Sequence, residues 1–153
     1  MKILEVENKP DDIKWFSVED DWTNSYPLIK QIAQATGATH WGNYGRIGMP
    51  WSSEMIGGSG TTIFRTPTGR FIADASVDYH RGKPRAVILS QIAVENSGAG
   101  AGSQIMRAIK KYADRLGIGV AVYKVTNPEF FRKFNWLDEK SGSFYYNLDT
   151  KRT

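Results

Sequence analysis

The segment that most constrains the fold is a strand, a glycine loop and a helix in immediate succession. Residues 86–94, AVILSQIAV, form a nearly continuous apolar run of strand length, which is typical of a central strand covered on both faces. The loop ENSGAGAGS follows, and then a helix that Gly117 closes. The apolar face of this helix carries Ile105, Met106, Ile109, Tyr112, Ala113 and Leu116. This order predicts an α/β fold.

The glycine loop predicts an anion site. Its small residues leave the backbone accessible, and the unpaired amides of a first helical turn carry a partial positive charge. We expect a pyrophosphate to bind over Gly98, Ala99, Gly100, Ala101, Gly102 and Ser103. Alternatively, the glycines serve only tight backbone packing. A Rossmann dinucleotide loop does not fit, because Ser103 stands where the third glycine is required.

The chain before this loop is patterned as short helices followed by a hairpin. Residues 20–35 carry apolar side chains at helical spacing, with Pro27 at the break or in the first turn. Residues 61–66 and 70–80 alternate in hydrophobicity around a Pro-Thr-Gly turn, which predicts two antiparallel strands. Residues 42–60, which lie between the helical region and the hairpin, carry the strongest loop signal in the chain.

The chain after the helix adds three shorter elements. Residues 120–125 are patterned as a strand, residues 129–134 as a short helix and residues 143–148 as a final strand. Together with the central strand and the hairpin, they predict a mostly antiparallel mixed sheet of about six strands flanked by helices.

Composition excludes several kinds of chemistry. The chain has no cysteine and only two histidines, so we expect no thiolate nucleophile and no metal site. Its 20 Lys and Arg against 16 Asp and Glu give a net charge of +4, which favours anionic partners. No apolar run is long enough for a membrane span or a secretory signal, so we expect a cytoplasmic protein without a membrane partner.

From about residue 61 to 148 the chain resembles the GNAT superfamily of acyl-coenzyme A-dependent N-acetyltransferases. The resemblance rests on the strand end Ile92-Ala93-Val94, on Gly100 and Gly102 of the loop, and on Asn127 with the segment 130–136. It implies a sheet splayed at its central parallel pair, with acetyl-coenzyme A lying in the splay. The implied cofactor-binding residues are Ile92, Val94, the glycine loop from Gly98 to Ser103, Asn127 and Phe131.

Because the sequence shows no fixed repeat, low-complexity tract or linker, we expect a single domain over residues 1–153. Its N-terminal part, 1–60, holds helices and loops, and residues 61–150 hold the sheet and the cofactor site. The implied reaction moves an acetyl group from acetyl-coenzyme A to an amine, which could be a protein lysine or N-terminus, a small amine or an aminoacyl-tRNA. The alternative is a binding protein with this fold and little or no turnover, acting through a protein or nucleic-acid partner.

The chain departs from the family at its catalytic positions. Phe131 replaces a tyrosine that protonates the leaving thiolate, Ser97 replaces a long polar anchor, and residues 86–94 contain no acidic side chain. His80 is a candidate proton relay because its ordinary pKa lies near neutrality, and Tyr123 is a candidate substitute acid. Their structural alternatives are a surface histidine in a basic turn and an ordinary strand aromatic.

The segment from His40 to Trp51 is the candidate acceptor surface. It combines large aromatics, glycines and one arginine, the composition of a recognition loop. Substrate contacts are expected from Trp41, Tyr44, Arg46 and Trp51. The alternative is that the tryptophans fold back as a lid on the core.

Overall fold

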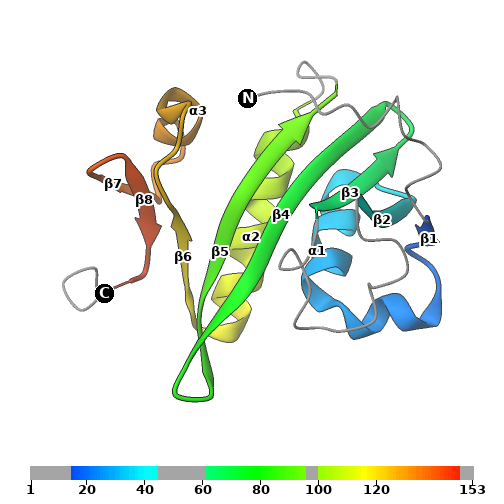
Figure 1. The fold of residues 1–153 in the computed structure, drawn as a ribbon, viewed down its shortest axis with the longest axis horizontal. Helices are drawn as coiled ribbons and strands as arrows, with labels where there is room; N and C mark the ends of the chain where they lie inside the picture. Colours follow the sequence, from blue (N-terminus) through cyan, green and yellow to red (C-terminus); the bar gives the residue numbers. More distant parts are fainter. Residues whose placement is uncertain (1–14, 45–60, 96–99, 149–153) are drawn as a thin grey trace.

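The computed structural model describes residues 15–44, 61–95 and 100–148 (Figure 1). In chain order its elements are β1 (Phe16–Ser17), the 3-10 helix η3 (Asp21–Ser25), α1 (Pro27–Thr36), β2 (His40–Tyr44), β3 (Thr61–Thr66), β4 (Gly69–His80), β5 (Lys83–Val94), α2 (Ala101–Leu116), β6 (Gly119–Val122), α3 (Pro128–Arg132), β7 (Asp138–Lys140) and β8 (Ser143–Tyr146). Within these residues, no helix is long and apolar enough to cross a membrane.

The described strands form one sheet in the order β1-β2-β3-β4-β5-β6-β8-β7. Every neighbouring pair is antiparallel except β5 and β6, which are parallel and connected through α2. The predicted fold class, a mixed α/β domain with a mostly antiparallel sheet, is confirmed. The sheet is wider than the predicted six strands, because β1, β2 and β7 carried no strand signal in the sequence.

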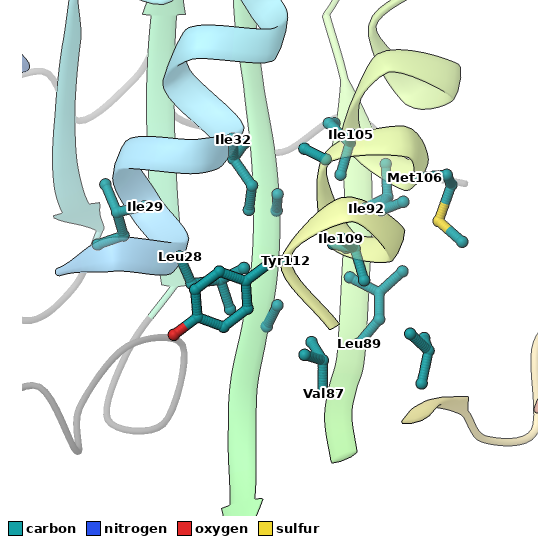
Figure 2. Packing of buried hydrophobic residues seen from close by; sticks show 14 of the residues in the cluster. Leu28, Ile29, Ile32, Val87, Leu89, Ile92, Ile105, Met106, Ile109 and Tyr112 are labelled. Carbon is teal, nitrogen blue, oxygen red and sulfur yellow. The ribbon is translucent and has the colours of Figure 1, made fainter. Parts of the chain in front are cut away.

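One face of the sheet is covered by α1 and α2 (Figures 1 and 2). Pro27 occupies the first turn of α1, as predicted, and Gly37 and Gly117 end the two helices in the left-handed conformation. The packed side chains labelled in Figure 2 include Leu28 and Ile32 of α1, Val87, Leu89 and Ile92 of β5, and Ile105, Met106 and Ile109 of α2. Each such burial contributes about 1.5–3 kcal/mol, so α2 is held firmly against β5.

The opposite face, which we call the outer face, has a much smaller apolar cluster. Ile63 of β3, Ile72 of β4 and Ala93 of β5 are buried there, with Trp15 packed against them. Successive side chains of a strand alternate between faces. Ala73 belongs to the core under the helices, so the next residue, Asp74, lies on the outer face with Ile72.

The central strand β5 is paired unequally along its two edges. Its β4 edge is paired from Lys83 to Val94, with bulges beside Asp74 and Asp78. The hairpin turn consists of Arg81 and Gly82, both at positive φ, so β5 begins three residues earlier than the sequence predicted. Its β6 edge is paired only over 86–88.

The segment from His40 to Trp51 differs from the predicted loop. His40–Tyr44 forms β2, which pairs with β3 along its whole length and with β1 at Trp41. Glycine at 42 suggested a loop, but here Gly42 lies opposite Ile63 inside the sheet. The N-terminal part therefore contributes two strands to the sheet in addition to helices.

Candidate functional site

A pocket of about 240 Å³ opens where β5 and β6 diverge. One wall is the β5 edge beyond its last pair with β6, and the other is the end of β6, the loop after it and α3. The lining residues are Leu89, Ser90, Gln91, Ile92, Val122, Tyr123, Lys124, Val125, Thr126, Asn127 and Phe131. The divergence of the parallel strands β5 and β6, which the resemblance implies, is therefore present and contains a pocket.

The divergence has a local cause in the chain that follows β6. The amide of Lys124 donates to Ser143 Oγ at 2.9 Å, and the amide of Val125 donates to the carbonyl of Gly142 at 3.0 Å. Lys124 itself adopts a left-handed φ of 46°, which turns the chain. These bonds tie the loop to the β7–β8 turn, so it cannot continue the ladder with β5. The peptide groups of β5 facing the pocket are left for a ligand.

Two aromatic side chains give the pocket different properties. Phe131 is 7% exposed and packs against Phe144 and Phe130, with ring centroids 5.5 and 4.9 Å away. It forms an apolar wall and has no proton to donate. Tyr123 is 45% exposed and meets the edge of Tyr145 at 5.9 Å, so its phenol is accessible from solvent. Among the described residues that line the pocket, Tyr123 is the only tyrosine.

The N-terminus of α2 has the geometry predicted for an anion site. Gly100 precedes the helix at a φ of 78°, and among the described residues no side chain caps this end. The first intrahelical bond runs from the amide of Gln104 to the carbonyl of Gly100, so the amides of Ala101 to Ser103 precede the hydrogen-bonded ladder. A Cβ atom at Gly100 would meet nothing within 4 Å in the part of the chain that the structure describes, which leaves an approach for a ligand. Gly98 and Ala99 lie outside the described residues.

Gly102 has a different role from Gly100. A Cβ atom at this position would lie 2.9 Å from the ring of Phe130, so the glycine allows α3 to pack closely on α2. Lys133 Nζ lies 4.5 Å from the centroid of the same ring. Because Phe130 also contacts Phe131, α3 connects the helix terminus to the pocket. Gly102 thus serves tight packing between α2 and α3, whereas Gly100 leaves the backbone accessible to a ligand.

The structure brings together some of the predicted residues. Ile92, Tyr123, Asn127 and Phe131 all line the pocket. Val94 is not among the lining residues and packs at the end of β5 against the core.

His80 lies away from the pocket. It is exposed at the tip of the β4–β5 hairpin, opposite Lys83. Lys83 precedes Leu89 by six residues of β5, which corresponds to about 20 Å at the rise of a strand. The structure does not bring His80 to the site.

The predicted acceptor residues separate in the same way. Trp41 is fully buried, its rings lie between Phe16 and Tyr26, and its indole N–H donates to Thr23 Oγ1 at 3.2 Å. This placement corrects the assignment of Trp41 to a substrate surface, because the side chain belongs to the core. Tyr44 ends β2, and Arg46 and Trp51 lie outside the described residues.

One titratable residue was missed by the sequence analysis. Burial raises the pKa of Asp74 from 3.8 to about 6, and a hydrogen bond from the amide of Thr62 opposes this rise. The sequence shows an aspartate between two alanines within an alternating strand. That pattern is a weak signal, since the burial of Asp74 depends on neighbouring strands that are distant in the sequence.

No protein-family model matches the chain, and no curated protein matches it. Among solved structures, the chain is similar to one described as "Crystal structure of AtaTR bound with AcCoA", with 18% sequence identity and a TM-score of 0.38. The match covers 89% of this chain and 93% of that chain. A likeness at this level carries no weight for function, which has to be argued from the site itself.

Proposed function

We propose that the protein is an acyltransferase that moves an acetyl group from acetyl-coenzyme A to an amine. The observation that carries this proposal is the connection, through α3, between the pocket beside β5 and the uncapped N-terminus of α2. An elongated ligand with an anionic segment at one end and an amide-containing arm at the other fits this arrangement. Acetyl-coenzyme A has both features.

Each part of the site suits one part of that substrate. The amides of Ala101 to Ser103 favour a pyrophosphate, with the cation of Lys133 on the neighbouring helix. The unpaired peptide groups of β5 from Leu89 to Gln91 favour the amides of an extended arm, which would bond as an added strand does. Ile92 and Phe131 supply apolar walls for its methylene groups.

The pocket also offers a group for the departing sulfur. When the amine nitrogen attacks the thioester carbon, a C–N bond forms, the C–S bond breaks and its electron pair leaves on sulfur. The phenol of Tyr123 lines the pocket and can donate a proton to this thiolate, then regain one from solvent. Phe131 cannot do so. Alignment of the reactants supplies much of the rate, because effective molarities can be worth about 7–11 kcal/mol.

Calorimetric titration with acetyl-coenzyme A tests the binding part of this proposal. We expect binding by the wild type and its loss in Gly100→Glu, because a carboxylate would stand in the anion site. Gly82→Glu is the matched control, since Gly82 has the same φ of 78° and equally open surroundings but lies at the hairpin tip. Equal heats of binding for the two variants would exclude the α2 terminus as the site.

Release of the coenzyme A thiol tests turnover. The protein contains no cysteine, so a thiol reagent reports only the product. We expect release with an amine acceptor, and radiolabelled acetyl-coenzyme A then distinguishes protein, small-amine and aminoacyl-tRNA acceptors. Tight binding without release for any acceptor class would instead support a binding protein that has lost turnover.

A further inference from the structure

The outer face of the sheet places a carboxylate one strand away from the pocket. Asp74 of β4 pairs with Gln91 of β5, and Gln91 lines the pocket. The next pair joins Ala75 to Leu89, so Ser90 is the extra residue of a bulge and is exposed in the pocket wall. Directly paired residues lie on the same face with Cβ atoms about 4.5–5.5 Å apart. Asp74 therefore lies on the same face as Gln91, one strand away from the wall of the pocket.

In the described part of the chain, no cation pairs with the carboxylate of Asp74. Among the described residues its hydrogen bond comes from the amide of Thr62 at 3.2 Å, where the β3–β4 ladder has already ended. The nearest charged groups along β4 are Arg70 and Asp78, each four residues away, or about 13 Å. They are engaged across the sheet with Glu95 and Arg85 of β5, respectively.

Among the described residues, the charged groups on the other elements nearby are Arg65 of β3 and Lys124, which lines the pocket with Gln91. On β3, Arg65 lies at the far end of the strand, opposite Arg70, and stacks over Trp15. On β5, Gln91 is neutral. The helices α1 and α2 cover the opposite face of the sheet. Burial without a counter-charge accounts for a pKa of about 6 for Asp74, which leaves the group ionised at neutral pH yet able to accept a proton.

We infer that Asp74 is the catalytic base that removes a proton from a cationic amine acceptor at the mouth of the pocket. This inference rests on the proposed function. The carboxylate takes one proton from the alkylammonium and leaves a neutral amine, whose nitrogen then attacks the acetyl carbon. The C–S bond breaks as the C–N bond forms, the thiolate takes a proton from Tyr123, and the remaining proton on nitrogen passes to solvent. Asp74 returns its proton to solvent.

The assignment is tested with n-butylamine as the acceptor and thiol release as the assay, both substrates saturating, between pH 5 and 10. For the wild type we expect a rate that rises with an apparent pKa of about 6. Asp74→Asn keeps an oxygen for the Thr62 amide but cannot take a proton. Its rate should fall about 10²- to 10⁴-fold at pH 7 and recover toward pH 10, where a growing fraction of the amine is itself neutral.

Two variants separate a catalytic role from a structural one. Asp74→Glu retains a carboxylate. It should recover part of the rate lost in Asp74→Asn, together with the fall in rate at low pH that the wild type shows. Asp78→Asn removes a carboxylate from the same strand, one that pairs with Arg85, and should leave the pH profile unchanged. Acetyl-coenzyme A affinity should be the same in all variants.

The possible outcomes distinguish this inference from the proposed function. If acetyl-coenzyme A does not bind the wild type, the proposed function fails and the inference fails with it. If the cofactor binds and thiol is released, but Asp74→Asn keeps the wild-type pH profile, only the role of Asp74 is overturned. Binding without any acetylation of n-butylamine by the wild type also overturns Asp74 as a base for alkylamines.

Discussion

The two edges of β5 show how one strand can be closed on one side and open on the other. Toward β4 the two strands are joined directly by the Arg81–Gly82 turn. They therefore pair from this turn to Val94. Toward β6 the chain returns through α2, and pairing stops after three residue pairs. Beyond that point the loop after β6 bonds to the β7–β8 turn instead.

This difference separates stability from binding. The closed side, from β1 to β5, contains three of the largest fully buried aromatics, Tyr26, Trp41 and Phe64, which stabilise the N-terminal half. The open side holds the pocket, with exposed Ser90 and half-exposed Tyr123. Substitutions on the two sides should therefore affect different measurements.

The largest effect is expected from Trp41→Ala on the closed side. Removing a fully buried indole leaves a cavity and loses the hydrogen bond that its N–H donates to Thr23 Oγ1, so the free energy of unfolding should fall by about 3–5 kcal/mol in urea denaturation. Tyr123→Ala on the open side is the control and should cost less than about 1 kcal/mol, because that ring is 45% exposed. Equal losses would contradict the division between the two sides.

A smaller loss of stability is expected from a substitution at Gly119, the first residue of β6, which pairs with Ala86 of β5. A Cβ atom at Gly119 would lie 2.5 Å from the carbonyl oxygen of Tyr146 and 2.5 Å from Leu148 Cγ. Because backbone must move to admit it, Gly119→Ala should lower the free energy of unfolding by about 3 kcal/mol. Gly82→Ala has open surroundings and should cost only about 1 kcal/mol, for its positive φ. Denaturation of both variants checks the difference.

Ser143→Ala tests what holds the pocket open. It leaves the amide of Lys124 without its acceptor, which should cost about 1 kcal/mol of stability. It should also weaken acetyl-coenzyme A binding in calorimetry, because the loop is no longer tied to the β7–β8 turn. Thr36→Ala loses a hydroxyl bond to Ile32 in α1 and should leave that affinity unchanged. If both variants bind like the wild type, the tie at Ser143 does not shape the pocket.

A further effect concerns the change of stability with pH. The folded pKa of Asp74, about 6, lies above an unfolded value near 3.8, so the folded state binds more protons between these values. Asp74 therefore costs the wild type stability as pH rises from about 4 to 6. The stability of Asp74→Asn relative to the wild type should increase over this window and level off above pH 7. A difference that stays constant with pH would show that Asp74 is not desolvated.

The sequence predicted the elements whose signals are local. The hairpin of β3 and β4, the strand, loop and helix around Gly100, and the caps at Gly37 and Gly117 follow from periodicity, turn residues and backbone preference within a few positions. Ile92, Asn127 and Phe131 were placed through the resemblance, and they do meet in one pocket.

Other features needed contacts between distant residues. The exposed residues Asp138–Lys140 of β7 have no apolar alternation, and β2 contains a glycine, so pairing with β8 and β3 makes them strands. Trp41 is a core residue because β2 places its ring in contact with the rings of Phe16 and Tyr26.

By itself, the sequence determined the α/β class, the order of most elements and the uncapped glycine entry to α2, because these depend on side-chain period and backbone freedom along the chain. The tertiary structure alone decided that the β5–β6 edge stays open, that His80 lies at a hairpin tip and that Asp74 is partly buried one strand away from the pocket. The physical reason is that burial and open hydrogen-bonding edges depend on which distant segments pack together, and no short stretch of sequence specifies its own neighbours.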